Sequence, residues 1–422
     1  MPGVVELGYS PLIGLGRGLR EGATMKMDRR VFLVGGGGAL LARATPSDQV
    51  VLGVIGSGGR GTSVMSVFQK EPVVRVGCIC DVYEPNLERA MAAAGKAGGS
   101  KPKAHRDYRK LLDDKDVQAV LIATPEHWHH RMVIDALDAG KVIYVVKPLC
   151  RTPPEGVELV QAEKRSNNIV QVGMQRRSYD LYLEARKVVA AGTLGTVRMI
   201  RSWWLNNYLG DAPVTRLDGK LDWEQWQGPA KRHPFSPMRF RNWRFFTDYA
   251  GGIVADQGAH VYDGMHLLMN AGYPRAVTAA AGRPHRAEVE TPESVVVTAE
   301  YPEDFIGVFS INYAAMKYQS RNDQLNHLDG DKGRMDIGRE EFRVHPAGAE
   351  ETVAVSKKSA EGFGKATVLH VQNFLECVRT RKAPAAPMAL GFQSALVVLM
   401  ANLSLAQGRR VRWNADLQRV EA

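Results

Sequence analysis

The chain has 422 residues, of which 45% are hydrophobic and 24% are charged, so it is long enough for two globular domains with full cores. Its formal net charge is +10 at pH 7, but the basic residues are scattered and no aromatic-basic RNA motif accompanies them, which argues against a nucleic-acid partner. The cysteines have no metal-ligand spacing, and we expect them to be buried small hydrophobic side chains: Cys78, Cys80, Cys150 and Cys377.

The N-terminal segment 1–44 has the pattern of a secretory signal. The paired arginines Arg29 and Arg30 precede Val31-Phe32-Leu33 and a short apolar, glycine-rich stretch, and Ala42-Arg43-Ala44 offers a small-residue cleavage site. This start resembles a twin-arginine signal, so we expect an exported, periplasmic protein; the alternative is a disordered basic tail. No later segment is expected to be long and apolar enough to span a bilayer, and we expect no membrane partner.

The stretch from Val50 to Asp81 has the pattern strand, glycine-rich turn, helix, strand, acid. In this pattern glycines permit a tight turn, a close approach to a pyrophosphate and close packing of helix on strand, while free N–H groups of the helix bind the phosphates. Asp81 falls about twenty residues after the last glycine, where a carboxylate binds the adenosine ribose and repels a 2′-phosphate, so NAD is favoured over NADP. The cofactor-binding candidates here are Gly56, Gly58, Gly59, Arg60, Gly61 and Asp81.

Strands and helices alternate as far as about residue 172, which predicts an α/β fold with a doubly wound parallel sheet in an NAD-binding domain over residues 45–173. Long β-rich runs then predict a substrate and oligomerisation domain over residues 174–422, built on an open, mostly antiparallel sheet with helices at 369–380 and 390–407 packed on it. The broad apolar face of that sheet favours a homo-oligomer. Residues 206–247, rich in Trp, Pro and Arg, have the composition of a long functional loop.

Polar residues follow two of the predicted parallel strands, at the edge where doubly wound folds bind their ligands. After the first of these strands we expect Thr124, Pro125 and His129 to face the cofactor. Lys147 ends the second strand, where it can contact the cofactor and hold an alcohol oxygen. No carboxylate or cysteine stands at ligand spacing from the histidines at positions 127, 129 and 130, so we expect no metal site.

Asp256 and His260 are four residues apart and share one face if their segment is helical. Histidine has a near-neutral pKa and is a natural base for removing the proton of an alcohol. Taken alone, this pair is also compatible with a capping acid and a buried histidine.

Several motifs together resemble the glucose-fructose oxidoreductase, inositol dehydrogenase and MocA family over essentially all of residues 50–413: GSGGRG, ATPEHWH, YVVKPL, Gly251-Gly252 and Asp256-x-x-x-His260. The resemblance implies a Rossmann domain, an α/β domain with an open sheet, and a bound nicotinamide cofactor. It gives Lys147, Asp256 and His260 the positions of the family's catalytic lysine, aspartate and histidine. The chain departs from the family at Val146, where a glutamate usually helps to hold the cofactor. The twin-arginine start and the C-terminal tail look most like the exported bacterial branch.

Five of the seven tryptophans gather around the predicted loop: Trp203, Trp204, Trp223, Trp226 and Trp243. Indole faces stack on sugar rings, so we expect a small carbohydrate as substrate; the alternative is a subunit interface or local core. The substrate-binding candidates are Arg176, Trp204, Tyr262 and Asp263.

The favoured function is an exported NAD-dependent oxidoreductase that moves hydride between a hydroxyl carbon of a sugar, polyol or glycoside and a bound nicotinamide. His260 would be the base, Asp256 would orient it or hold a hydroxyl, and Lys147 would hold the reacting oxygen. NADH has no obvious route to reoxidation outside the cytoplasm, so we expect regeneration in place. One alternative is an NAD-using glycosidase in which oxidation, elimination, hydration and reduction give no net redox change. Another is a non-catalytic sugar-binding protein on a Rossmann scaffold.

Overall fold

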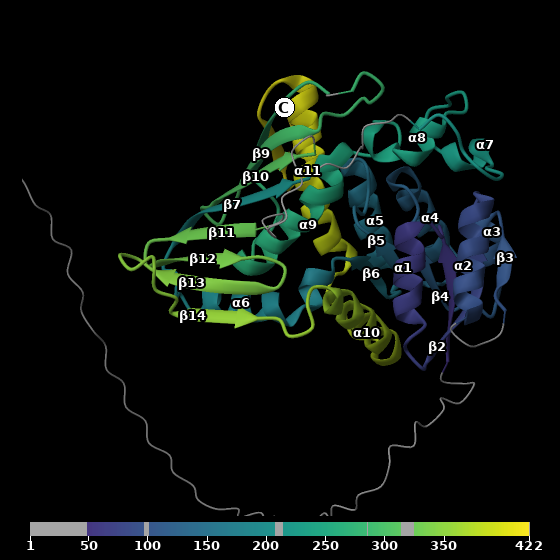
Figure 1. Ribbon diagram of the computed structural model, residues 1–422, viewed down its shortest axis with the longest axis horizontal. Helices are drawn as coiled ribbons and strands as arrows, with labels where there is room; N and C mark the ends of the chain where they lie inside the picture. Colours follow the sequence, from purple (N-terminus) through teal and green to yellow (C-terminus); the bar gives the residue numbers. More distant parts are fainter. Residues whose placement is uncertain (1–48, 97–100, 207–213, 285, 314–324, 422) are drawn as a thin grey trace, which may run out of the picture. The chain divides into compact units, whose positions relative to one another are not determined.

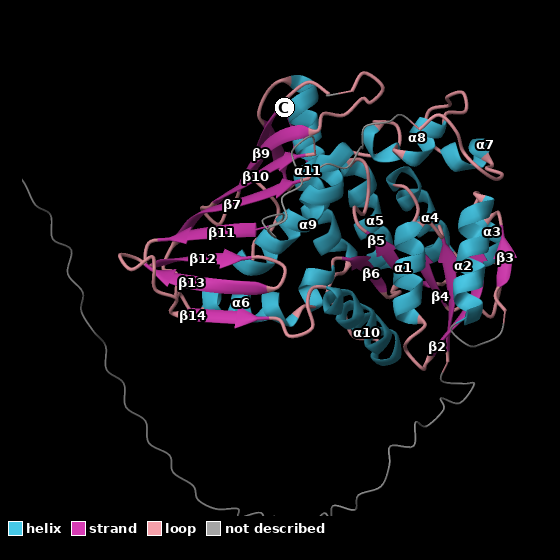
Figure 2. Ribbon diagram, in the orientation of Figure 1, coloured by secondary structure: helices cyan, strands magenta, loops and turns pink. Residues whose placement is uncertain are grey.

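Two β-sheets organise the part of the chain that the computed structural model describes, residues 49–96, 101–206, 214–284, 286–313 and 325–421 (Figures 1 and 2). The signal expected in residues 1–44 lies outside the described residues, and its export function stays a prediction.

The first sheet is parallel and has six strands in the order β3-β2-β1-β4-β5-β6. Its central strand β1 pairs with β2 on one side and with β4 on the other, so the strand order reverses beside β1, and this reversal is where doubly wound folds bind ligands. β1 is buried on both faces, which explains its continuous apolar sequence. The strands are β1 (Val50–Ile55), β2 (Val74–Cys80), β3 (Lys103–His105), β4 (Ala119–Ile122), β5 (Val142–Val146) and β6 (Val170–Gly173).

Helices cover both faces of this sheet (Figure 2). Five of them follow strands of the sheet: α1 (Gly59–Phe68), α2 (Glu84–Lys96), α3 (Tyr108–Leu112), α4 (His129–Asp138) and α5 (Pro153–Ser166). The parallel, doubly wound sheet predicted from the sequence is confirmed, and the elements that the sequence did not reveal are α2, β3 and α3.

The helix α10 (Gly364–Thr380) also packs on this domain, which corrects the expectation that both C-terminal helices lie on the second sheet. Phe374 of α10 makes edge-to-face contacts with Phe68 of α1, at 5.8 Å between ring centroids, and with Tyr144 of β5, at 5.7 Å. The spacing of apolar residues in the sequence shows that this helix has a buried face but does not show which sheet covers it.

The second sheet has ten strands in the order β14-β13-β12-β11-β7-β10-β9-β8-β15-β16, and β7 and β10 form its one parallel pair among the described residues. The predicted neighbours β9 and β10 are antiparallel and are joined by the turn that begins at Tyr301. The mostly antiparallel second sheet is thereby confirmed. Its strands are β7 (Val197–Leu205), β8 (Ala276–Ala281), β9 (Ser294–Glu300), β10 (Ile306–Asn312), β11 (Leu325–Gly330), β12 (Gly333–Ile337), β13 (Glu341–Pro346), β14 (Val355–Lys358), β15 (Val411–Asn414) and β16 (Arg419–Glu421).

Three long helices lie between the sheets or on the second one: α6 (Asp180–Ala190), α9 (Gly252–Met269) and α11 (Met388–Gln407). Among the described residues α11 is the one helix with the length and composition to cross a membrane, which corrects the expectation that no later segment has them. However, 67% of its apolar window is buried inside the protein, where it contacts α9, α5 and β8, so it has the environment of a core helix.

The predicted loop over residues 206–247 contains short helices: α7 (Trp223–Gln227), α8 (Pro237–Arg241) and η4 (Trp243–Phe245). It is held against the first domain, because the Tyr83 hydroxyl donates a hydrogen bond to the carbonyl oxygen of Asp218 at 2.5 Å and Tyr83 forms an isolated β-bridge with Leu221. This strap, which we define as residues 217–249, therefore reaches the edge where the parallel strands end.

Candidate active site

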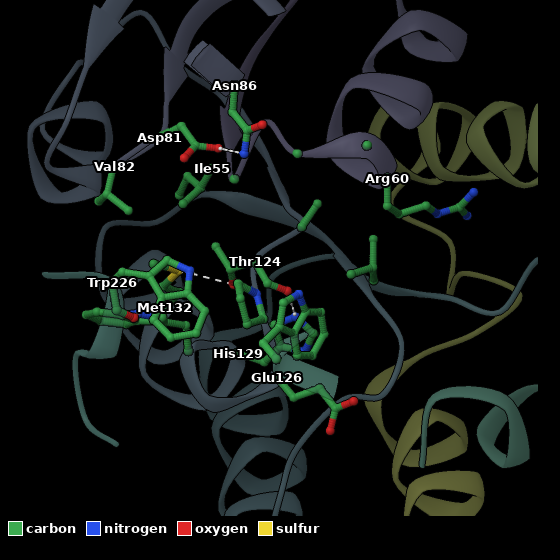
Figure 3. Close-up of a pocket in the computed structure, with 18 of the residues that line it drawn as sticks. Ile55, Arg60, Asp81, Val82, Asn86, Thr124, Glu126, His129, Met132 and Trp226 are labelled. Atoms are coloured by element: carbon green, nitrogen blue, oxygen red, sulfur yellow. Dashed lines mark hydrogen bonds between the residues drawn. The ribbon is translucent and has the colours of Figure 1, made fainter. Parts of the chain in front are cut away.

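A cavity of about 500 Å³ lies at the carboxyl ends of the parallel strands, beside the reversal of strand order. One wall comes from the glycine turn and from the residues that follow β2, β4 and β5. The opposite wall comes from α9 and from residues 225–244 of the strap. Figure 3 shows part of this lining, with Asp81 near the turn and Thr124, Glu126 and His129 after β4.

The glycine turn leaves room for a dinucleotide. Gly56 has a φ of +85°, and an added Cβ there would lie 2.8 Å from the backbone of Ala123. A Cβ on Gly61 would lie 1.9 Å from the carbonyl oxygen of Gly56, so Gly61 is needed for close packing of α1 beneath the pocket. Gly58 and Gly59 line the pocket, where an added Cβ would have its nearest neighbour at 3.7 Å for Gly58 and none within 4 Å for Gly59. The N-terminus of α1 is thus open to a pyrophosphate, and Arg60 lines the same wall.

Asp81 is fixed on the pocket wall directly after β2. Its Oδ2 accepts hydrogen bonds from the Ser57 backbone N–H at 2.8 Å and the Ser57 hydroxyl at 3.1 Å, and its Oδ1 accepts one from the Tyr83 N–H at 2.9 Å. Burial raises the pKa of this carboxyl, while the donors from Tyr83 and Ser57 oppose the rise. Asp81 therefore joins the glycine turn to the end of β2, in the position expected for a ribose-binding acid.

The turn after β4 contributes Thr124, Pro125 and His129 to the pocket lining. The buried His129 ring lies between two carbonyl oxygens: Nδ1 is 2.6 Å from that of Pro148 and Nε2 is 2.9 Å from that of Thr124. The ring thus connects this turn to the turn that follows Lys147.

The three neighbouring histidines do not converge on one point. The Nε2 of His127 is 2.9 Å from the carbonyl oxygen of Trp226, and the Nε2 of His130 is 2.9 Å from a carboxylate oxygen of Glu158. The part of the chain that the structure describes holds no group of three side chains arranged to bind a metal ion.

Lys147 and Asp256 form a partly buried ion pair. The Lys147 Nζ donates hydrogen bonds to the carboxylate Oδ1 and to the backbone carbonyl of Asp256, both at 2.6 Å. The other carboxylate oxygen receives the Gln257 side-chain amide at 2.9 Å and lies 3.2 Å from the Arg244 Nε. Burial alone would raise the pKa of Asp256, but Lys147 and Arg244 outweigh it and lower that pKa. Asp256 is therefore a fixed carboxylate at neutral pH.

His260 lies one turn after Asp256 on α9, on the shared helix face that the four-residue spacing predicted, and both residues line the pocket. Neither ring nitrogen of His260 has a hydrogen-bond partner among the described residues. Burial lowers its pKa well below the usual value, and the positive charges of Lys147 and Arg176 lower it further. His260 is therefore neutral near pH 7 and able to accept a proton.

The four residues expected to bind substrate do not line this pocket. Tyr262 is fully buried and donates to the carbonyl of Val297, because it lies on the opposite face of α9 from His260. Asp263 lies on the same side of α9 as His260 but further along the helix, where it is buried and forms an ion pair with Arg177 at 2.5 Å. Two further candidates are also buried elsewhere.

Arg176 donates a hydrogen bond from Nη1 to the backbone carbonyl of His260 at 3.0 Å and thus contacts the backbone of α9. Trp204 is buried on the second sheet with the guanidinium of Arg339 over its ring. The tryptophans that do line the pocket are Trp128, Trp226 and Trp243. The composition of the strap signals aromatic side chains but does not show which of them face inward.

The sequence reasoning gave no role to Glu126 and Arg244, both of which line the pocket. Glu126 lies within the ATPEHWH motif, which is the sequence feature that could have identified it as a site residue. Arg244 stands in the strap and pairs with Asp256 at 3.2 Å, a contact across 12 residues of sequence that no local pattern reveals. Val146, the departure from the resembled family, is an apolar lining residue with 8% of its surface exposed.

The parallel sheet, the glycine turn and the acid after β2 define a dinucleotide-binding Rossmann protein with a second α/β domain. Residues 50–174 match the oxidoreductase family with an NAD-binding Rossmann fold, and residues 182–336 match the GFO/IDH/MocA C-terminal domain. The chain therefore belongs to the GFO/IDH/MocA family, and its first domain binds NAD.

Two of the similar proteins carry names that indicate different activities. A levoglucosan dehydrogenase from Pseudarthrobacter phenanthrenivorans is 29% identical over 226 residues, which cover 52% of this chain and 50% of that protein. A glycosyl hydrolase family 109 protein from Shewanella sp. (strain ANA-3) is 39% identical over 117 residues, covering 27% of this chain and 26% of that protein. The chain thus aligns with half or less of the length of these relatives.

Among solved structures, a levoglucosan dehydrogenase in complex with NADH and levoglucosan is similar in fold, with a TM-score of 0.70 and 21% identity. The match covers 86% of this chain and 99% of that one. It supports the two-domain architecture as a whole.

Proposed function

We propose that the protein is an NAD-dependent oxidoreductase acting on a hydroxyl carbon of a sugar, polyol or glycoside. The observation that carries the proposal is the convergence of Lys147, Asp256 and His260 in the same pocket as the glycine turn. Gly58, Gly59, Arg60 and Asp81 would hold the dinucleotide.

The chemistry divides between the cofactor and three side chains. A bound nicotinamide would supply the acceptor for a hydride from the carbon that carries the reacting hydroxyl. The neutral His260 takes the proton of that hydroxyl, and the Lys147 ammonium holds its oxygen and stabilises the negative charge that develops there. Asp256 fixes Lys147 through two short contacts and, as a carboxylate that stays ionised, keeps the ammonium charge in place.

The proposed substrate class rests on the pocket wall and on the relatives. Trp243 and Trp226 line the cavity, and indole rings can stack on the C–H faces of sugars. Relatives named as levoglucosan and inositol dehydrogenases act on compounds of this class.

A second candidate function is an NAD-using glycosidase without net redox change. The similarity to glycosyl hydrolase family 109 proteins favours it. So does export, which we propose from the twin-arginine pattern of residues 1–44, because an exported enzyme needs its cofactor regenerated in place. We also propose a homo-oligomer, supported by Met199 and Val296, which are exposed apolar side chains on the second sheet.

One experiment tests the proposal. The protein is purified without added nucleotide, any bound dinucleotide is identified after denaturation, and the native form is incubated with a panel of sugars, polyols and glycosides while nicotinamide absorbance and products are followed. Absorbance changes that are lost in His260→Ala and Lys147→Ala support the proposal. Product release without a lasting absorbance change would favour the glycosidase, and dinucleotide binding with neither product nor absorbance change would instead indicate a sugar-binding protein.

A further inference from the structure

Glu126 is a buried carboxyl in the pocket wall that the mechanism above does not use. Its side chain is 2% exposed, and its Oε2 accepts the backbone N–H of Gly251 at 3.0 Å. Its Oε1 has no hydrogen-bond partner among the described residues. In Figure 3 the Glu126 carboxyl extends away from the labelled Thr124 and His129 side chains. A buried oxygen without a partner is costly and calls for an explanation.

The contact with the start of α9 accounts for only one of the two carboxyl oxygens of Glu126. Gly251 directly precedes α9, and one carboxyl oxygen is sufficient to bind its N–H. The second oxygen contributes nothing to that contact and is buried without a partner, although Glu126 belongs to the same pocket lining as Asp256, His260 and Lys147. This carboxyl therefore has an unused hydrogen-bonding oxygen on a residue of the pocket wall.

The charges around Glu126 keep its two protonation states close in energy. It faces Asp256 on α9, Lys147 and Arg151 after β5, and the thiol of Cys150. Burial raises the pKa of Glu126 to about 7, and Asp256 adds to the rise, while the Gly251 N–H, Lys147 and Arg151 oppose it. Near neutral pH this carboxyl can therefore both donate and regain a proton.

The other two acid–base candidates of the pocket have different capacities. Asp256 receives hydrogen bonds from Lys147 and Gln257 and is held ionised, so it cannot donate a proton near neutral pH. His260 is neutral and can accept one. A pocket that contains one group able to donate a proton and another able to accept one suits a reaction with two proton transfers. Oxidation of an alcohol by itself requires only one.

We propose that Glu126 is the general acid of the glycosidase pathway and donates its proton to the oxygen of the leaving group. This rests on the proposed function, which supplies the oxidised carbon. His260, having returned its first proton to water, takes a proton from the adjacent carbon; the C–H electrons form a C=C bond, the C–O bond breaks, and the leaving oxygen takes the Glu126 proton. Water then adds to the double bond: its oxygen bonds to the carbon that lost the leaving group, one of its protons goes to Glu126, and His260 returns its proton to the adjacent carbon. Return of the hydride and uptake of a proton from water would then restore the alcohol.

The test compares leaving groups in the full-length, NAD-loaded protein. Glu126→Gln keeps an acceptor for the Gly251 N–H but carries no acidic proton. We expect it to slow release of methanol from methyl glycosides by about 10²–10⁴-fold, the usual contribution of a general acid. Release of 4-nitrophenolate from 4-nitrophenyl glycosides should slow by less than about 10-fold, because this leaving group departs as an anion and gains little from a general acid. A purely structural role would slow both releases equally and would overturn the proposal.

Glu163→Gln is the matched control. Burial also raises the pKa of Glu163 to about 7, but this carboxyl accepts the Met388 N–H on α11 and lies outside the pocket lining. We expect both releases to stay unchanged in this variant. Glu126→Asp, which keeps an acid, should recover part of the methanol release.

Nicotinamide absorbance separates the two proposals. Absorbance changes without any release of a leaving group would overturn the role of Glu126 and leave the oxidoreductase proposal standing. No absorbance change and no release of a leaving group with any substrate would remove the oxidoreductase proposal. In that case infrared spectroscopy still reports on Glu126, through the carboxylic C=O band that is absent in Glu126→Gln. A band that titrates near pH 7 and shifts when methyl glycoside is added agrees with an acid that contacts the ligand. A carboxyl that is ionised throughout pH 5–9 overturns the proposal.

Discussion

The ammonium of Lys147 lies 2.6 Å from the carboxylate of Asp256 and 2.6 Å from its backbone carbonyl, although the residues belong to different domains. This double contact fixes the end of β5 against α9. It also places a positive charge beside the position of the neutral His260, since that charge is one of the causes of the lowered His260 pKa.

Replacement of Lys147 tests the role of this charge. In Lys147→Met we expect turnover of the identified substrate to fall by about 10²-fold or more, because the reacting oxygen loses its electrostatic partner. The pKa of Asp256 should rise as its main charge partner is removed. Steady-state kinetics measure the loss. Lys103→Met is the control, since its ion pair with Asp114 lies outside the pocket and its side chain is 61% exposed. Turnover in Lys147→Met close to wild type would contradict the assigned role.

Asp81 should control the affinity for the dinucleotide. Asp81→Ala removes the acceptor of the Ser57 and Tyr83 hydrogen bonds, and each such bond to a charged group contributes about 1.5–3 kcal/mol. We expect NAD affinity to fall by about 10–100-fold, and NADP affinity to fall less because the repulsion of a 2′-phosphate is also removed. Isothermal titration calorimetry with both nucleotides measures the ratio. The exposed Asp138→Ala serves as control, and an unchanged preference for NAD would count against the ribose-binding role.

Gly61 should be required for packing of α1 on β1. A Cβ at this position would lie 1.9 Å from the carbonyl oxygen of Gly56, and backbone must shift to relieve the overlap. We expect Gly61→Ala to lower the free energy of unfolding by about 1–3 kcal/mol. Gly95→Ala in α2 meets no atom within 4 Å and should be neutral or slightly stabilising. Denaturant unfolding followed by circular dichroism compares the two, and equal stabilities would show that α1 tolerates the shift.

His370 should make stability depend on pH. Its ring is fully buried between the Val172 carbonyl and the Ser178 hydroxyl, and burial lowers its pKa to about 4. Between pH 6.5 and 4 the unfolded histidine binds a proton that the folded one does not, so its contribution to the free energy of unfolding falls as the pH falls. At pH 5 this loss is about 2 kcal/mol relative to pH 7.5.

His370→Gln isolates that contribution from those of other titrating groups. The variant should be less stable than wild type at pH 7.5 because two buried hydrogen bonds are disturbed. The difference between the two proteins should shrink by about 2 kcal/mol at pH 5, since only the wild type loses stability by protonation of this residue. Urea unfolding at both pH values provides the numbers. A difference that does not change with pH would mean that His370 titrates normally in the folded state.

Local patterns determined the cofactor domain of this protein. The glycine turn, the helix after it and Asp81 lie within one stretch of sequence, and the constraints that shape them act between close neighbours, such as Gly61 against Gly56. The spacing of Asp256 and His260 likewise predicted a shared helix face because that geometry is periodic. These features could be read without knowing the partners of each element.

Only the tertiary structure decided what faces the pocket from the second domain. Tyr262 and Asp263 stand beside His260 in the sequence, but the rotation and depth of α9 bury them behind it. Arg244 and Trp226 reach the site because the strap is anchored at Tyr83. The pKa of Glu126 is raised by burial and by Asp256 of the other domain. Orientation, burial and charge between distant segments depend on packing, which no periodicity in the chain encodes.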